Sequence, residues 1–438
     1  MKLNQVFAEC VFLSCVLTAP AQTINEDNKF VASDAEIINL FGNSIGISGT
    51  TAIVGTWDSS GTQAGAAYLF DTKSGNQIAK LGASFPAPGD MFGWSVAISG
   101  TTAIVGARGH AGSAYVFDAV TGEQLFKLTE SDSMVDNYFG DTVAISNSTA
   151  IVGAYRANLA GAAFLFNTDT GAQIFKLTSN DLAFDDQFGR SVGISGTTAI
   201  VGAPQDSDAG THSGSAYLFD TTTGLQLAKL TASDAEALDD FGRSVAISGT
   251  IAIVGSPSDD DAGFKSGAAY LFDTLTGVQL AKLTASDAAA DDRFGRAVAI
   301  SGTTAIVGSA GDDDSGSYSG SAYLFDTTTG LQLAKLTASD AEEFDSFSDS
   351  VAISGTSVVV GAPRDDNTGS SSGSAYLFTL ASPCLADLTD EGDLNFLDVS
   401  AFLSAFGNQD PVADFEADGN FNFLDVSAFL SAFGAGCP

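Results

Sequence analysis

Two acidic segments near the C-terminus carry the residues whose types and spacing indicate the most definite chemistry. In each segment, oxygen-bearing side chains fall at positions one, three, five and twelve, glycine falls at six, and position seven can offer its backbone carbonyl. This is the ligand order of a calcium loop, in which a hard cation is held by oxygen atoms alone. The first segment offers Asp387, Thr389, Glu391, Asp393 and Asp398, and the second offers Asp414, Glu416, Asp418, Asn420 and Asp425.

Each acidic segment is followed by a stripe of apolar residues with the period of a helix. Val399, Phe402, Leu403 and Phe406 lie at i, i+3, i+4 and i+7, and Val426, Phe429, Leu430 and Phe433 repeat the pattern. The duplication spans 386–407 and 413–434, so a chance match to one acidic loop does not explain it. We therefore expect a small module over 384–438, with two calcium loops that each precede one helix.

A second set of acids gathers upstream in the segments between short apolar runs. As a candidate cation-binding face we take Asp259, Asp260, Asp261, Asp312, Asp313, Asp314, Asp365 and Asp366. Clustered carboxylates suit Ca²⁺. The alternative is a solvated acidic surface that keeps the protein soluble, because runs such as DDD do not fix a ligand register.

These upstream acids belong to a repeat of about 50 residues. Phe-Gly recurs at Phe41, Phe92, Phe139, Phe188, Phe241 and Phe294, with Phe347-Ser348 as a degenerate seventh copy. Each unit carries four short phrases, for example SVGIS, TAIVG, GSAYLFD and QLAKLTASD, which have the composition of strands bounded by tight turns. A four-stranded antiparallel unit of this period predicts the blade of a β-propeller.

The number of phrases predicts how the ring closes. The first three phrases occur seven times, but the fourth follows a third phrase only six times. The missing copy stands alone near the N-terminus, in KFVASDAE, where Lys29 aligns with a lysine in every other fourth phrase. We therefore expect an all-β, seven-bladed propeller over 22–380 whose last blade is completed by an N-terminal strand. A lysine on each outermost strand is expected to discourage pairing between strand edges.

Strand direction predicts that the acids share one face. Loops between the second and third strands emerge on the same side as the links between blades, and both sets of loops carry the acids. The short turns SGT and DTTTG emerge on the other side, which is rich in Ser, Thr and Gly.

The N-terminus has the pattern of a secretory signal over 1–21. Lys2 precedes an apolar run, and Ala19-Pro20-Ala21 offers small residues for cleavage. The run is too short to span a bilayer, so we expect no membrane span in the mature chain. Cleavage leaves Cys384 and Cys437 as an even pair flanking the C-terminal module, and we expect a disulfide between them in an oxidising compartment. A lipoprotein signal at Cys15 is disfavoured by Phe12.

Charge narrows the choice of partners. Acids outnumber bases 53 to 17, and the formal charge is −36. Such a field repels nucleic acid and anionic membranes and attracts cations. We expect no nucleic-acid partner.

The phrases FGRSVAISGT and AIVGAP resemble FG-GAP repeats, which build the propeller of integrin α-subunits and of many secreted bacterial proteins. The resemblance covers all seven units. It implies ligand binding on the face formed by the loops between strands two and three and between blades. Integrin-type propellers also hold calcium in a hairpin between FG and GAP. Here that interval reads SVAISGTTAIV in most blades, with no carboxylate, so those sites are not expected.

The C-terminal duplication resembles dockerin modules of the type that ends in Gly-Cys, here GAGCP. Closure of each loop by Asp and the presence of one helix per loop support this resemblance. It implies calcium binding and docking into a cohesin-like receptor through the start of each helix. The matching positions are Phe396, Leu397, Ser400, Phe423, Leu424 and Ser427. Two similar halves would allow docking in two orientations related by a half turn.

We therefore expect a secreted, non-enzymatic binding or adhesion protein with an unknown protein or glycan ligand on the propeller. A propeller enzyme is one alternative, but Trp57 and Trp94 are too few for quinoprotein-type blades, and His110 and His212 lie in unrelated loops without a recognisable nucleophile. Paired carboxylates could still serve glycan chemistry. A purely structural extracellular spacer is the other alternative.

Overall fold

The protein is described here from a computed structural model. It describes residues 22–34, 39–57, 61–110, 112–130, 137–181, 183–366, 369–380, 386–389, 394–415 and 419–435.

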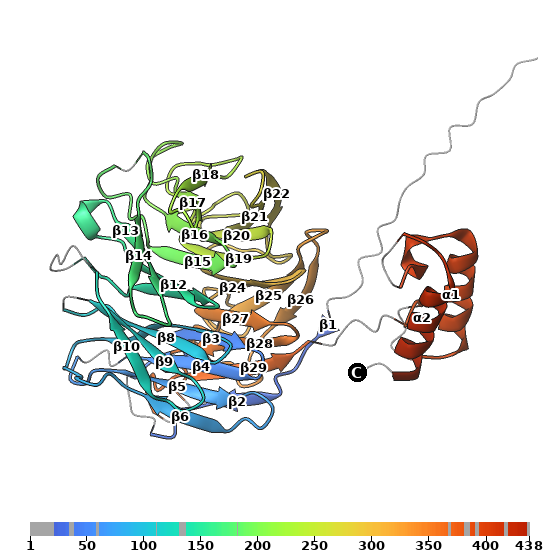
Figure 1. The fold of residues 1–438 in the computed structure, drawn as a ribbon, viewed down its shortest axis with the longest axis horizontal. Helices are drawn as coiled ribbons and strands as arrows, with labels where there is room; N and C mark the ends of the chain where they lie inside the picture. The colour runs from blue at the N-terminus through green and yellow to red at the C-terminus, as the bar shows by residue number, and fades with distance from the viewer. Residues whose placement is uncertain are drawn as a thin grey trace, which may run out of the picture.

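Seven antiparallel blades form a ring (Figure 1). The first three blades contain β3 (Ser44–Ser48), β4 (Thr51–Thr56), β5 (Ala66–Asp71), β6 (Gln77–Leu81), then β7 (Phe92–Ser99), β8 (Thr102–Ala107), β9 (Ser113–Asp118), β10 (Gln124–Leu128), then β11 (Thr142–Ser146), β12 (Thr149–Ala154), β13 (Ala162–Asn167), β14 (Gln173–Leu177). The next three contain β15 (Ser191–Ser195), β16 (Thr198–Ala203), β17 (Ser215–Asp220), β18 (Gln226–Leu230), then β19 (Ser244–Ser248), β20 (Ile251–Ser256), β21 (Ala268–Asp273), β22 (Gln279–Leu283), then β23 (Ala297–Ser301), β24 (Thr304–Ser309), β25 (Ser321–Asp326), β26 (Gln332–Leu336). A short 3₁₀ turn, η1 (Ala157–Leu159), lies in the third blade.

The seventh blade confirms the predicted closure. It contains β27 (Ser350–Ser354), β28 (Ser357–Ala362) and β29 (Ser374–Thr379), and its outer strand is β2 (Asn28–Phe30) from the N-terminus. Lys29 pairs with Tyr376 and Phe30 pairs with Ala375 in antiparallel register. A two-residue strand, β1 (Gln22–Thr23), also lies parallel to β26 of the sixth blade. The N-terminal segment therefore contacts both blades beside the junction.

Packing between blades forms the core. Seven apolar clusters each combine residues of two neighbouring blades, and one of them joins Leu377 of the last blade to Phe70 of the first. An open array of seven units would have only six such interfaces. Within each blade the phenylalanine of Phe-Gly packs on the third strand; Phe241, for example, meets the rings of Tyr270 and Phe272 edge-on at 5.5 and 5.8 Å. These aromatic contacts explain why the Phe of the repeat recurs.

Hydrogen bonds of the repeat serines also run from blade to blade. The Ser191 hydroxyl donates to the carbonyl of Gly242 in the next blade at 2.8 Å, and Ser350 donates across the junction to Gly42 at 2.7 Å. On the opposite face, the turn between the first two strands of every blade donates a backbone N–H to a serine of the preceding blade. The donor is the glycine of SGT in six blades, including Gly49 to Ser354 across the junction, and Asn147 in the third blade. The junction therefore has the same contacts as the continuous interfaces.

Two helices follow the propeller. They are α1 (Phe396–Asn408) and α2 (Phe423–Ala435), with a 3₁₀ turn, η2 (Pro411–Ala413), between them. Phe402 of α1 stacks on Phe429 of α2 with ring centroids 4.1 Å apart, and Phe415 meets both rings edge-on. The predicted apolar stripes therefore face each other, although Leu403 and Leu430 of those stripes remain exposed. No helix in the described part of the chain is long and apolar enough to cross a membrane.

Candidate functional sites

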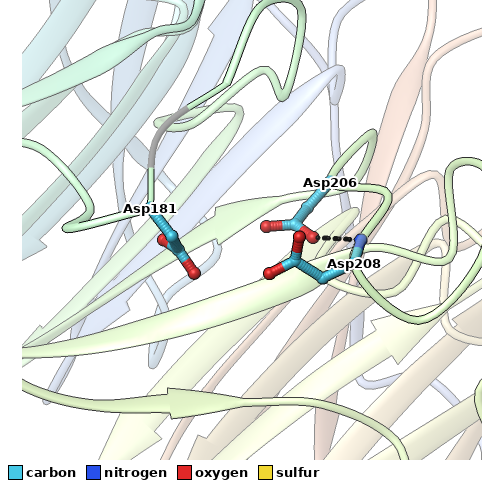
Figure 2. A group of neighbouring side chains, drawn as sticks. All are labelled: Asp181, Asp206 and Asp208. Carbon is cyan, nitrogen blue, oxygen red and sulfur yellow. Dashed lines mark hydrogen bonds between the residues drawn. The ribbon is translucent and has the colours of Figure 1, made fainter.

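Three blades carry an identical cluster of acids around one lysine. In the fifth blade, Lys282 of β22 places its Nζ 2.9 Å from Asp259, 2.6 Å from Asp261 and 2.9 Å from Asp234. Asp259 and Asp261 lie in the loop between β20 and β21, and Asp234 lies in the link from the preceding blade. Lys229 is surrounded in the same way by Asp181, Asp206 and Asp208, and Lys335 by Asp287, Asp312 and Asp314. Figure 2 shows the three carboxylates of the Lys229 cluster converging from two loops.

The lysine is the cation that these carboxylates hold. The three ligand oxygens of each cluster lie within 4.8 Å of one another, a spacing that could suit a metal ion. Burial opposes the charge of Lys282, but its hydrogen bonds to Asp261, Asp234 and Asp259 outweigh this and raise its pKa. Burial likewise opposes ionisation of Asp234, but the hydrogen bond and charge of Lys282 lower its pKa below the ordinary value. A metal ion would have to displace an ammonium group that already has three partners.

The predicted cation-binding face is therefore divided. Asp259, Asp312 and Asp365 are buried, and each accepts a hydrogen bond from a tyrosine hydroxyl of its blade at 2.6 or 2.7 Å. Asp261 and Asp314 are exposed and bind the same lysine as their buried neighbour. The remaining exposed carboxylates are Asp260, Asp313 and Asp366. The fourth-strand lysines thus join these acids, a role that the sequence did not indicate.

Arginines line the mouth of the central channel on the same face. The residue after each Phe-Gly enters the innermost strand of its blade, and in order around the ring these residues are Asn43, Trp94, Asp141, Arg190, Arg243, Arg296 and Asp349. All but Trp94 line a cavity of about 290 Å³, with serines and branched apolar residues beneath them. We did not identify these channel-mouth residues from the sequence. Alignment of the seven repeats would have shown three arginines and two aspartates at the position after Phe-Gly.

Aromatic rings hold several arginines in place beside the channel. Trp57 and Trp94 lie 4.9 Å apart, and the Arg108 guanidinium stacks 3.4 Å from the Trp94 ring. Tyr138 and Tyr155 stack at 5.3 Å in the next blade. Arg190 lies 4.9 Å from the Tyr155 ring. This arrangement fixes the orientation of the guanidinium groups, because a stacked arginine loses freedom about its side-chain bonds.

The described parts of the C-terminal loops fit calcium. In the first loop the Thr389 hydroxyl donates to Asp398 at 2.8 Å and lies 3.5 Å from Asp387, so positions one, three and twelve converge. Hydrogen bonds from the backbone N–H of Asn395, and from Thr389, lower the pKa of Asp398 to about 2. The carboxylate is therefore ionised and would hold a cation at neutral pH.

The second loop turns back as a calcium loop does. The backbone N–H of Gly419 donates to Asp414 at 2.8 Å, and Gly419 has φ +74°, which favours glycine at position six. Asp425 is fully buried and accepts a hydrogen bond from Asn422 at 2.8 Å. The other predicted ligands, Glu391, Asp393, Glu416 and Asp418, and the cysteines Cys384 and Cys437 lie outside the described residues.

The predicted partner-binding residues lie on the surface. Phe396 and Phe423, at the first position of their helices, are 79% and 78% exposed. Leu397 and Leu424 are more than half exposed, and Ser400 and Ser427 are exposed as well. Both helices thus present the same apolar start to solvent.

The comparisons show the family. The FG-GAP repeat family matches seven times, at residues 24–70, 76–117, 123–166, 172–219, 225–272, 278–325 and 331–378, so the chain belongs to the FG-GAP repeat proteins. Each match begins at or near a fourth strand and ends with a third, as the offset closure requires.

Comparison with curated proteins finds no match. A solved structure similar to this chain is the crystal structure of the computationally designed Ika8 protein, with 14% identity and a TM-score of 0.49, covering 80% of this chain and 99% of that chain.

Proposed function

We propose that this protein is a secreted, non-enzymatic binding protein that is attached to other proteins through its C-terminal module. The propeller engages an extracellular protein or glycan with the face that carries the loops between strands two and three. Propellers of the FG-GAP family are typically extracellular, which supports this assignment. The C-terminal helices act as a dockerin-like module that binds a cohesin-type receptor when its loops hold calcium.

The observation that carries the proposal is the paired exposure of Phe396 and Phe423. Large apolar side chains at a helix start are unfavourable in water unless a partner covers them. Here the exposed pair is duplicated, and each copy follows an acidic loop whose closing aspartate, Asp398 or Asp425, caps the same helix. Calcium bound by a loop would therefore fix the docking residues directly after it.

The test is retention of the full chain on immobilised cohesin-type receptors. We expect calcium-dependent retention that EDTA reverses. Because either half can dock, Phe396→Ala alone should retain binding, whereas Phe396→Ala with Phe423→Ala should weaken it at least about tenfold, as expected for loss of a buried aromatic anchor. The matched control is Leu275→Ala, which removes an 80% exposed apolar side chain from the propeller. Retention that is unchanged by EDTA and by the double substitution would contradict the proposal.

A further inference from the structure

All seven arginines of the chain lie on one face of the propeller. Arg108, Arg156 and Arg364 lie in the loops just after second strands, and Arg190, Arg243, Arg293 and Arg296 precede inner strands. The lysines are placed differently, because seven of them lie on the outer fourth strands or on β2. In a chain with a formal charge of −36, this gathering of arginine about the channel needs a cause. Arginine differs from lysine in presenting a planar fork of donors that matches sulfate, phosphate and carboxylate groups.

The arginines at the channel mouth are only partly neutralised. Arg190 forms an ion pair with Asp141, which also binds Arg108 at 2.6 Å. Arg296 forms an ion pair with Asp349. Arg243, between Arg190 and Arg296 in the ring, forms no ion pair with any residue that the structure describes. Four guanidinium groups thus share two carboxylates.

Arg243 is held in an unfavourable place. It is half-buried in the wall of the cavity. Burial, followed by the positive charges of Arg190 and Arg296, lowers its pKa to about 10, and the attraction of Asp141 and Asp240 does not compensate. Charge repulsion of this kind reduces stability, and it is common at sites where a ligand of opposite charge relieves it.

The cavity has the size and lining for a small anionic group. Its volume of about 290 Å³ lies near the lower end of the range for small-molecule sites. The layer beneath the arginines consists of serines such as Ser191 and Ser244, whose hydroxyls already donate to the next blade. Guanidinium groups are therefore the free donors at the mouth.

We propose that the mouth of the central channel is an oxyanion-binding site, in which Arg243, flanked by Arg190 and Arg296, binds the sulfate, phosphate or carboxylate group of an extracellular ligand. This deepens the propeller half of the proposed function and rests on it, because it names the chemistry of the ligand on that face. Asp141 and Asp349 hold the two flanking arginines, and Arg243 is the anchor of the anion. The acidic loops farther from the channel would repel an anionic ligand unless its negative group reaches the arginines at the channel mouth.

The test is calorimetric titration of the full chain with inorganic sulfate, inorganic phosphate and acetate at constant ionic strength. We expect saturable binding of at least one of these anions. Arg243→Gln should weaken it by roughly 10- to 100-fold, which corresponds to the loss of a charge-assisted hydrogen-bonding partner. The affinity of Arg243→Lys should lie between those of the natural chain and Arg243→Gln, because lysine keeps the positive charge but lacks the planar fork of hydrogen-bond donors.

The matched control is Lys73→Gln, which removes one positive charge from an exposed turn on the opposite face. It should leave anion binding unchanged. Equal weakening by Lys73→Gln and Arg243→Gln, or no saturable binding of any of the three anions, would overturn the site. Unfolding curves of Arg243→Gln in the absence of added anion separate loss of binding from loss of fold, and relief of repulsion predicts that this variant is no less stable than the natural chain.

A second arm identifies the source of the anion. A sulfated disaccharide that binds more tightly than sulfate, beside an unsulfated disaccharide that does not bind, indicates an anionic group carried by a glycan. Tighter binding of the inorganic ion indicates a free anion, and both results support the site. If the chain binds none of these anions but is still retained by a cohesin-type receptor, only the oxyanion site is overturned. Loss of retention with intact anion binding would overturn only the anchoring.

Discussion

Lys29 and Asp365 meet at the junction of the ring, with Nζ 2.7 Å from Oδ2, although 336 positions separate them in the chain. Asp340 binds the same ammonium group at 2.7 Å, and the Tyr376 hydroxyl donates to Asp365 at 2.6 Å. The residues around Lys282 are arranged in the same way where two blades are joined by continuous chain. The junction is therefore held by side chains as well as by the backbone pairing of β2 with β29.

We expect Lys29→Met to lower the free energy of unfolding by about 2 kcal/mol. The substitution leaves the nearly buried carboxylate of Asp365 without its ammonium partner, and removal of one member of a buried pair is costly. Partial exposure of Asp340 reduces the effect. Urea unfolding, followed by tryptophan fluorescence, measures the change, with Lys73→Met as the control for an exposed lysine. Equal stability of the two variants would show that the pair does not hold the junction.

Removal of residues 22–30 should be more damaging than Lys29→Met. Without β2 the edge of β29 is left unpaired, and Phe30 no longer covers the cluster between the seventh and first blades. We expect a lower urea midpoint than for Lys29→Met and increased aggregation, measured by light scattering. An unchanged midpoint would mean that β2 does not contribute to closure.

Gly242, the glycine of the fifth Phe-Gly, should not tolerate the side chain of alanine. At Gly242 φ is +88°, and a Cβ atom would lie 2.3 Å from the carbonyl oxygen of Ser215. Gly249, in an SGT turn, has φ +56° and no atom within 4 Å of that position. We expect Gly249→Ala to lower the free energy of unfolding by about 1 kcal/mol through backbone strain alone, and Gly242→Ala to lower it by at least about 3 kcal/mol. Thermal unfolding of the two variants checks this, and equal losses would contradict the steric argument.

The seventh copy shows how a side chain can be accommodated at the position of this glycine. Ser348 replaces it at φ +73°, and its hydroxyl donates to Ser321 at 2.6 Å and accepts from the backbone N–H of Ser309 at 2.9 Å. The one repeat that departs from Phe-Gly thus satisfies its side chain by hydrogen bonds to the preceding, sixth blade.

The sequence was sufficient for the fold because every repeat encodes the same strands and turns. The unmatched copy around Lys29 also predicted the closure, since the pairing partner was missing from only one blade. The two C-terminal helices likewise followed from a duplicated local pattern, and the calcium loops before them stay a prediction. Such features depend on residues close together in the chain.

The side-chain sites could not be predicted because they depend on contacts between blades. Lys282 reaches Asp234 in the preceding link, and this contact requires the angle between neighbouring blades. Arg190, Arg243 and Arg296 lie far apart in the chain and converge only because seven inner strands surround one axis. The variation after Phe-Gly was visible in the sequence, but its position at the channel mouth was not.

Removal of Lys282 should turn a salt-bridge cluster into a calcium site. In the natural chain Asp234, Asp259 and Asp261 have ligand oxygens within 4.8 Å of one another, and Lys282→Ala removes the ammonium group that they share. We expect this variant to be destabilised in EDTA by about 2 kcal/mol and to be restored by calcium, which supplies the missing charge. Trp57 and Trp94 lie in the propeller, so their fluorescence reports thermal unfolding of this part of the chain.

The matched comparison is the natural protein under the same two conditions. Because Lys282, Lys229 and Lys335 hold their carboxylates, calcium should leave the tryptophan-detected transition of the natural chain unchanged. A calcium-induced rise in that transition, of the size seen in Lys282→Ala, would mean that the ion displaces lysine in the natural protein. Lys73→Ala controls for the loss of one positive charge.

The propeller should become more stable as the pH falls from about 7 to about 5. Asp239, Asp292 and Asp345 are buried beneath the acidic loops, and burial, aided by the charges of neighbouring acids, raises the pKa of each from 3.8 to about 6. The folded state therefore binds protons in this range that the unfolded state does not, so stability increases as these groups protonate and decreases as pH rises through 6. We expect about 1 kcal/mol from each site, measured by urea unfolding.

Combined substitution of Asp239, Asp292 and Asp345 by Asn should raise the free energy of unfolding at pH 7 and remove its dependence on pH between about 5 and 7. The Asn side chains can still accept the backbone hydrogen bonds that the three carboxylates now accept, which come from Glu236, Ala289 and Glu342. At still lower pH, stability decreases with falling pH. Lysine partners lower the pKa of Asp34, Asp234 and Asp340 below the ordinary value of 3.8. The stabilising ion pairs of these acids are therefore present above pH 3.8 and are lost as the pH falls below it. Stability should therefore pass through a maximum between about pH 4 and 5. A natural chain that loses stability steadily from pH 7 downward, in parallel with the Asn variant, would contradict the raised pKa of these three acids.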